Sequence, residues 1–161
     1  NKGMCSDKLT KSIINKAKKK NIPVFVDPKG KYWSKYAGAT CITPNTKEVS
    51  ELGNYKLNKN QNFELAGKDI LKKFNIKQCL VTRGKDGMSM ISNDEHFHLP
   101  SNVKEVFDVS GAGDTVIACL AAAIICGISD REAVEFANKA AGIVVGHIGT
   151  SAITKRELTG K

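Results

Sequence analysis

The stretch Val106-Phe107-Asp108-Val109-Ser110-Gly111-Ala112-Gly113-Asp114-Thr115 leads without a break into the apolar, alanine-rich segment 116–126. Small residues let the backbone approach a ligand closely, and a helix that begins here directs unpaired N–H groups toward it. Such donors stabilise the negative charge that develops on a phosphoryl group during transfer. Asp114, at the mouth of the helix, can accept a proton from an attacking hydroxyl. By themselves, these residues fit a glycine-rich turn with a helix cap equally well.

Outward from this loop, three short apolar runs occupy residues 24–26, 39–43 and 79–81, which is typical of strands buried on both faces. Alternating apolar and polar residues at 88–91 and 96–99 favour a pair of antiparallel strands. Helical signals separate the apolar runs and continue beyond the glycine-rich loop. This order of elements predicts an α/β fold with a mainly parallel, Rossmann-like sheet flanked by helices. The expected helices cover residues 7–20, 46–52, 62–74, 114–126 and 130–145.

Each of the three apolar runs ends in a polar loop. The loops are Asp27-Pro28-Lys29, Pro44-Asn45-Thr46-Lys47-Glu48 and Thr82-Arg83-Gly84. In an open parallel sheet, ligands bind outside the carboxyl ends of the strands. The sequence therefore predicts that these loops and the glycine-rich loop meet at one edge of the sheet and form one site.

Asn45 and Glu48 have the spacing N-x-x-E, so that an amide and a carboxylate share one face of a helix. Oxygen ligands of this kind suit Mg²⁺, which keeps much of its water. The same pair also fits a helix cap in which Asn45 and Glu48 bond to each other's backbone, with Gly53 ending the helix. Both interpretations stay open at this point.

The string that ends in Gly-Ala-Gly-Asp, together with the helix after it, resembles the second signature of the ribokinase-like (PfkB-type) carbohydrate kinases. The resemblance implies that Asp114 is the catalytic base that deprotonates a sugar hydroxyl. It also implies that Gly111, Ala112 and Gly113 form the anion hole for the transferred phosphate. Asp108 is then expected near the nucleotide or a cation.

Other positions match the same family in the same order. Asn45 and Glu48 correspond to its motif for organising Mg²⁺, here through water, and phosphate. Thr82, Arg83, Gly84 and Gly87 resemble the T-x-G-x-x-G segment that contacts ATP phosphates and ribose, although a hairpin turn after a strand also explains them. Asn138, with Ala141 and Gly142, is expected to line the adenine slot; an ordinary polar helix residue is the alternative.

Three further stretches resemble the heptose 7-phosphate kinase branch of the family. They are residues 25–31, 42–45 and 140–150. The resemblance implies phosphorylation of the anomeric hydroxyl of D-glycero-D-manno-heptose 7-phosphate in ADP-heptose and lipopolysaccharide biosynthesis, often beside an adenylyltransferase domain. Lys29 is then a candidate contact to a phosphate, or a solvated loop lysine. Another ribokinase-like sugar or nucleoside kinase and a non-catalytic nucleotide-binding module remain alternatives.

Kinase domains of this family are much longer than the 161 residues of this chain. We therefore expect residues 1–161 to be a single domain, the carboxy-terminal ATP-binding half, incomplete at its N-terminal side. Such a half is expected to show little kinase activity alone. The resemblance also implies a homodimer in the full-length enzyme.

The chain carries a net charge of +9, which favours anionic partners such as ATP and sugar phosphates. No aromatic residues interrupt the lysine-rich run 16–20, so the stacking platform of a single-stranded nucleic-acid binder is missing there. The five cysteines form no C-x-x-C pair and are expected to be buried or half-buried thiols in a reducing cytoplasm. The apolar segment 116–128 is too short to span a membrane.

Overall fold

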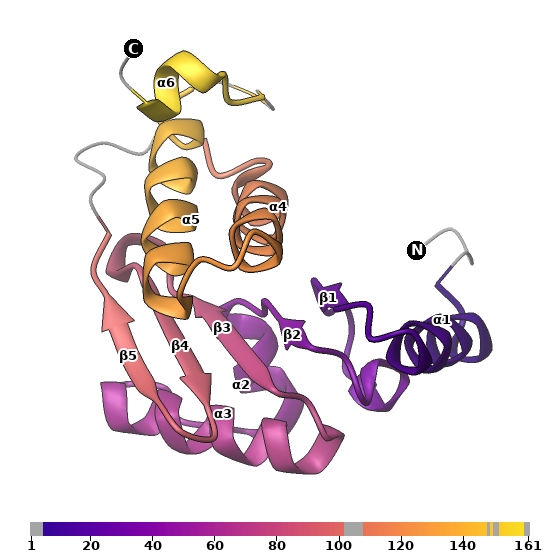
Figure 1. Ribbon diagram of the computed structural model, residues 1–161. Coiled ribbons are helices and arrows are strands. Elements are labelled where there is room, and N and C mark those ends of the chain that lie inside the picture. Colours follow the sequence, from indigo (N-terminus) through magenta and orange to yellow (C-terminus); the bar gives the residue numbers. More distant parts are fainter. Residues whose placement is uncertain (1–4, 102–107, 148, 150–151, 160–161) are drawn as a thin grey trace. The chain divides into compact units, whose positions relative to one another are not determined.

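The computed structural model describes residues 5–101, 108–147, 149 and 152–159 (Figure 1). Strands and helices alternate in the first part of the chain, and helices alone follow the glycine-rich loop. The elements are α1 (Asp7–Lys19), β1 (Phe25–Val26), η1 (Trp33–Tyr36), β2 (Cys41–Ile42), α2 (Thr46–Gly53), α3 (Asn60–Phe74), β3 (Gln78–Thr82), η2 (Gly84–Asp86), β4 (Met88–Ser92), β5 (His96–Leu99), α4 (Ala112–Ile125), α5 (Asp130–Val144) and α6 (Lys155–Thr159).

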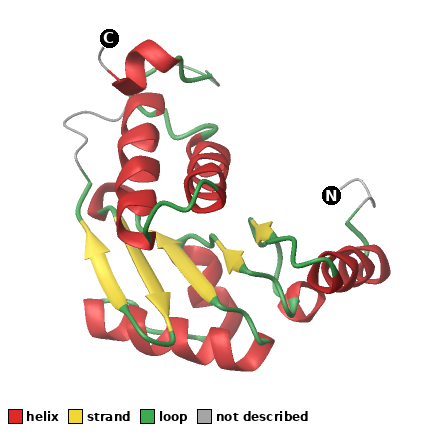
Figure 2. Cartoon of the chain, in the orientation of Figure 1, coloured by secondary structure: helices red, strands yellow, loops and turns green. Residues whose placement is uncertain are grey.

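The five strands form one mixed sheet in the order β1-β2-β3-β4-β5 (Figure 2). β1, β2 and β3 are parallel, with Phe25 opposite Cys41 and Ile42 opposite Cys79. β4 and β5 run in opposite directions because only residues 93–95 connect them, and Ser92 N–H donates to the Glu95 carbonyl at 2.8 Å. The predicted parallel strands and the predicted antiparallel pair are both confirmed.

The chain divides into two compact units. The first consists of Asn1–Val81 and Ser89–Phe97, and the second of Thr82–Met88 and His98–Lys161. That residues 1–161 form a single domain remains a prediction.

The core of the first unit lies between the sheet and its helices. α3 packs closely against β4: a methyl group at Gly67 would stand 2.8 Å from Ile91 Cγ1. A glycine inside a helix lowers helix stability, and here the close approach of helix and strand explains its presence. The buried side chains of this core include Ile14, Trp33, Ile42, Phe63, Ile70, Leu71, Phe74, Val81 and Ile91.

Most helix ends lie within two residues of the predicted ones, and two of the differences have a clear structural reason. α2 continues through Gly53, and Asn54 takes the left-handed conformation that ends the helix, with φ of 55°. A side chain at Gly53 would collide with the Tyr55 ring, so Gly53 is required for packing and not for ending the helix. α4 begins at Ala112, ahead of the predicted start at residue 114, because Gly111 adopts φ of 80° as its N-cap.

In the second unit, α4 and α5 lie side by side (Figure 1). Val116, Leu120 and Ala123 of α4 are buried, as are Ala133 and Ala137 of α5. Small residues at this interface allow the two helices to approach closely. α5 begins at the Ser129 cap, whose hydroxyl accepts from Glu132 N–H at 3.4 Å.

No helix in the described part of the chain is long and apolar enough to cross a membrane. All five cysteines are free thiols. Cys41 and Cys79 are buried, as expected, but the expectation is wrong for Cys5 and Cys126, which are exposed. Cys5 precedes α1 and Cys126 follows α4, where the side chains at helix ends face water.

Candidate functional site

The glycine-rich loop ends in the first turn of α4. The first intrahelical bond runs from Thr115 N–H to the Gly111 carbonyl at 3.0 Å, so the N–H groups of residues 112–114 have no acceptor inside the helix. The Ala112 N–H donates to the Val109 carbonyl at 3.2 Å and closes the turn. The Gly113 and Asp114 amides are therefore the better placed donors for an anion at this helix end.

Asp114 lies in this first turn and is exposed. A carboxylate here interacts favourably with the positive end of the helix dipole. Apart from its chain neighbours and the backbone of its own helix, no atom of the described residues lies within 4 Å of a methyl group built at Gly113. The first turn of α4 thus combines an accessible carboxylate with open space beside Gly113, an arrangement compatible with an anion at the helix end and a proton acceptor next to it.

Asp108 holds the start of the glycine-rich loop in place. Its Oδ1 accepts from Ser110 N–H at 2.8 Å and its Oδ2 accepts from Gly149 N–H at 3.1 Å. Hydrogen bonds from the Ser110 backbone, then from its side chain and from Gly149, lower the pKa of Asp108. The carboxylate therefore joins the loop to the segment after α5, while its contact with nucleotide or cation remains a prediction. Val106 and Phe107 lie outside the described residues.

The turn between β3 and β4 has a clear structural reason for its glycines. Arg83 N–H donates to the Gly87 carbonyl at 2.8 Å, and Gly84 and Gly87 have φ of 59° and 88°. A side chain at Gly87 would collide with the Leu99 carbonyl oxygen. The hairpin-turn alternative therefore accounts for Gly87 by itself, and its contact with ATP remains a prediction.

Three other residues of the second unit were predicted to contact the nucleotide: Thr82, Arg83 and Asn138. Thr82 is the last residue of β3. The Arg83 guanidinium lies 3.1 Å from His98 Nδ1. Asn138 of α5 is 7% exposed, and its side-chain amide donates to the Pro100 carbonyl at 2.9 Å. Asn138 thus ties α5 to the end of β5, and a contact with adenine is not required to explain it.

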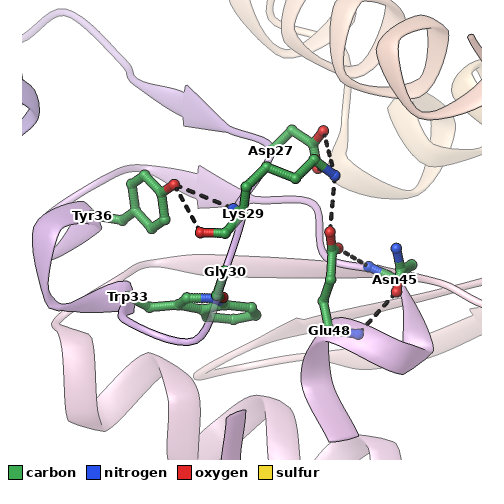
Figure 3. Close-up of polar contacts among 7 residues, drawn as sticks. All are labelled: Asp27, Lys29, Gly30, Trp33, Tyr36, Asn45 and Glu48. Atoms are coloured by element: carbon green, nitrogen blue, oxygen red, sulfur yellow. Dashed lines mark hydrogen bonds and ion pairs between the residues drawn. The ribbon is translucent and has the colours of Figure 1, made fainter. Parts of the chain in front are cut away.

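In the first unit, three charged side chains meet after the carboxyl ends of β1 and β2 (Figure 3). Lys29 Nζ lies 2.8 Å from Glu48 Oε1 and 3.0 Å from Asp27 Oδ2. Burial opposes the charge on Lys29, but hydrogen bonds to Glu48 and Asp27 prevail and raise its pKa. Asp27 was absent from the predicted binding residues, although its position directly after the apolar run 24–26 was a signal for it.

The loop that carries Lys29 is anchored from both sides (Figure 3). Trp33 is 1% exposed, and its indole N–H donates to the Gly30 carbonyl at 2.8 Å. Lys29 N–H donates to the Tyr36 hydroxyl at 3.2 Å. Neither aromatic was predicted to support the site, because the short turn η1 that carries both of them was not predicted.

Asn45 and Glu48 form the predicted helix cap. Asn45 Oδ1 accepts from Glu48 N–H and Glu48 Oε2 accepts from Asn45 N–H, both at 2.9 Å. Capping does not exhaust these oxygens, because each keeps a further lone pair. An amide and a carboxylate oxygen fit a hydrated Mg²⁺. Among the described residues, no group of three or more His, Cys, Asp or Glu side chains is placed to hold a metal by itself.

The predicted residues thus fall into two groups. The first unit brings Lys29, Asn45 and Glu48 together. The second unit contains the remaining predicted residues: Thr82, Arg83, Gly84, Gly87, Asp108, Gly111, Ala112, Gly113, Asp114 and Asn138.

Comparison with known families and sequences gives a consistent result. Residues 2–156 match the family described as pfkB family carbohydrate kinase. The Bifunctional protein HldE of Vibrio parahaemolyticus is 47% identical over 148 residues, which cover 91% of this chain and 31% of that protein. HldE of Trichlorobacter lovleyi is 41% identical over 158 residues, covering 98% of this chain and 32% of that protein. The chain spans about a third of the length of these relatives.

Solved structures agree with the sequence matches. A ribokinase from Arabidopsis thaliana complexed with ribose and ATP has a TM-score of 0.81 and 27% identity, covering 89% of this chain and 48% of its own. A Thermotoga maritima ribokinase has a TM-score of 0.79 and 27% identity, covering 92% of this chain and 52% of its own. Escherichia coli phosphofructokinase-2, at 23% identity and a TM-score of 0.84, shares the fold over 96% of this chain and 50% of its own.

Proposed function

Because the chain belongs to the pfkB family of carbohydrate kinases and has the ribokinase-like α/β fold expected from its sequence, we propose that its protein transfers a phosphoryl group from ATP to a sugar. The observation that carries this proposal is the exposed Asp114 carboxylate in the first turn of α4, next to the open backbone at Gly113. A base and an anion-binding helix end are the two parts that phosphoryl transfer asks of a protein.

The proposed acceptor is the anomeric hydroxyl of D-glycero-D-manno-heptose 7-phosphate, and the product is the 1,7-bisphosphate of the ADP-heptose and lipopolysaccharide route. Support comes from the relatives named HldE and from the three stretches that resemble heptose 7-phosphate kinases. The net charge of +9 suits two anionic substrates. A cytoplasmic location and a homodimer of the full-length protein belong to the same proposal.

The reaction assigns one task to each group of residues. Asp114 accepts the proton as the sugar oxygen bonds to the γ-phosphorus, and the bond from that phosphorus to the β–γ bridging oxygen breaks, releasing ADP. Amides at the start of α4, in the segment Gly111, Ala112 and Gly113, stabilise the charge on the transferred group. Asn45 and Glu48 would hold Mg²⁺ through water, and the ion would then neutralise phosphate charge.

The remaining assignments concern the nucleotide. Arg83 with Thr82 and Gly84 contacts phosphate and ribose, Asn138 borders the adenine, and Lys29 contacts a phosphate. Gly87 and Asp108 shape the loops that present these groups. Because the chain spans about a third of its relatives, we propose that it binds nucleotide but shows little kinase activity alone.

The test is a substrate profile of the full-length protein with ATP and Mg²⁺. Heptose 7-phosphate, ribose, fructose 6-phosphate and a nucleoside are compared by kcat/KM, and the product is identified by phosphorus NMR. The proposal expects the heptose to be preferred and phosphorylated at its anomeric position. Preference for another acceptor would identify a different ribokinase-like kinase. ATP binding without any turnover would indicate a nucleotide-binding module, and strong salt-dependent DNA binding would indicate a nucleic-acid partner.

A further inference from the structure

Glu48 has little room for a metal ion beside Lys29. One oxygen, Oε2, accepts from the Asn45 backbone at 2.9 Å, and the other, Oε1, accepts from Lys29 Nζ at 2.8 Å. The Glu48 side chain is only 15% exposed, whereas the Lys29 side chain is 62% exposed. The ammonium group therefore lies on the solvent side of a partly buried carboxylate.

We infer that the ammonium group of Lys29 acts as a resident cation, paired with the Glu48 carboxylate in the ligand-free protein. This ion pair must break before Glu48 can hold a hydrated divalent cation. This inference rests on the assignment of Glu48 to Mg²⁺ in the proposed function. The physical reason is repulsion between like charges, since a divalent ion next to Oε1 would lie close to the ammonium group. Lys29 is thus a positioning residue that acts through Glu48.

Asp27 gives the ammonium group a second anchor. Its Oδ2 lies 3.0 Å from Lys29 Nζ, and its side chain is 26% exposed. When Lys29 leaves Glu48, it can stay paired with Asp27 and still present its exposed ammonium group to an anion. The two carboxylates and one ammonium sum to one negative charge, so the cluster attracts a further cation as soon as Lys29 has moved.

Movement of the side chain, and not loss of its proton, is the route open to Lys29. The hydrogen bonds to Glu48 and Asp27 keep it charged through the neutral pH range, in line with the raised pKa. The backbone of Lys29 is held by Tyr36, so the long side chain is the part that can move. Metal binding at Glu48 and phosphate binding at Lys29 are therefore coupled, because both require the Lys29 side chain to move away from Glu48.

The test measures Mn²⁺ affinity of the full-length protein without nucleotide, by electron paramagnetic resonance. Mn²⁺ prefers the same oxygen ligands as Mg²⁺. Lys29→Met is expected to tighten Mn²⁺ binding about threefold to fivefold, the range that removal of a partly exposed ion pair allows. Lys47→Met is the matched control: Lys47 is next to Glu48 in α2, its side chain is 84% exposed, and the substitution removes the same charge. Equal Mn²⁺ affinities in these two variants would overturn the inference.

A second pair of variants separates this inference from the proposed function. Glu48→Gln is measured with Lys29 intact and with Lys29→Met, and thermal melting verifies that each variant is folded. The inference expects Glu48→Gln to remove the gain that Lys29→Met produces. If Glu48→Gln weakens Mn²⁺ binding but Lys29→Met does not tighten it, the inferred role of Lys29 as a resident cation is wrong, and the assignment of Glu48 to the metal stands. If Glu48→Gln changes nothing in either background, the metal assignment itself fails, and the inference with it.

Discussion

Lys29 Nζ lies 2.8 Å from Glu48 Oε1, although the two residues are 19 positions apart in the chain. Lys29 follows β1 and Glu48 belongs to the first turn of α2, after β2. β1 and β2 are parallel neighbours, so their carboxyl ends bring these loops to one place. The ion pair is therefore a consequence of the parallel pairing of β1 and β2, on which this part of the proposed site also depends.

Asp114→Asn is expected to lower kcat of the full-length kinase at least about 100-fold, the usual scale for loss of a general base. The amide keeps the size of the side chain but cannot take a proton. Affinity for ATP, measured by calorimetry, should stay nearly unchanged because the backbone donors are intact. Asp130→Asn makes the same change in the first turn of α5 and should retain activity. A fully active Asp114→Asn enzyme would remove the base from the mechanism.

Gly113→Ala is expected to reduce activity while leaving the fold intact. The described residues leave open space around a methyl group at this position, so the free energy of unfolding should change by less than about 1 kcal/mol. The methyl group would enter the space where the proposed phosphate lies. Urea unfolding and steady-state kinetics measure the two effects separately.

Gly111→Ala provides the comparison for that variant. Gly111 has φ of 80°, which costs a residue with a side chain about 1–2 kcal/mol. We expect the Gly111→Ala variant to have a lower free energy of unfolding than the Gly113→Ala variant in the same urea experiment. Unimpaired kinetics in Gly113→Ala would argue against an anion at this helix end.

Gly87→Ala is expected to destabilise the protein by at least about 2 kcal/mol, because strain at positive φ adds to a collision with the Leu99 carbonyl. Gly84→Ala is the control in the same turn. Gly84 also has positive φ, but no described atom lies within 4 Å of its added methyl group, so about 1–2 kcal/mol is expected. Chemical denaturation compares the two, and equal losses would contradict the close packing at Gly87.

Asp108→Asn is expected to make stability less dependent on pH in the acid range. Hydrogen bonds from Ser110 and Gly149 lower the pKa of Asp108 below its ordinary value of 3.8, so the folded protein binds this proton less tightly than the unfolded chain. The carboxylate therefore contributes stability above pH 3.8, and that contribution is lost as pH falls through the lowered pKa.

The measurement is the melting temperature of both proteins between pH 7 and pH 3. The difference between wild type and Asp108→Asn should be largest near neutral pH and should narrow as the solution becomes acidic. A constant difference across this range would mean that the loop is held by something other than the ionised carboxylate.

Local patterns in the sequence were enough to predict most elements of this chain. The helix cap at Asn45 is confirmed, because a cap depends only on residues within one turn. The three parallel strands follow equally from short apolar runs, although β1, at the edge of the sheet, is only half-buried. The resemblance carried by the Gly-Ala-Gly-Asp string indicated the family, which residues 2–156 confirm.

Helix ends were harder to predict because they depend on packing. The sequence pattern predicts that Gly53 ends the helix. In the structure the Tyr55 ring fills the space that a side chain at Gly53 would need, and Asn54 ends the helix. A glycine needed for close packing and a glycine needed for its backbone angle look identical in a sequence. Only the neighbours in space distinguish them.

By itself, the sequence determined the order of the main helices and strands, the Asn45 cap and the glycine-rich turn that leads into α4. Tertiary structure alone decided that Lys29 pairs with Glu48, that Gly87 packs against Leu99 and that Asn138 bonds to Pro100. The physical reason is range. Caps and periodicity arise from interactions within a few residues, whereas these contacts depend on the register and packing of segments that are distant along the chain.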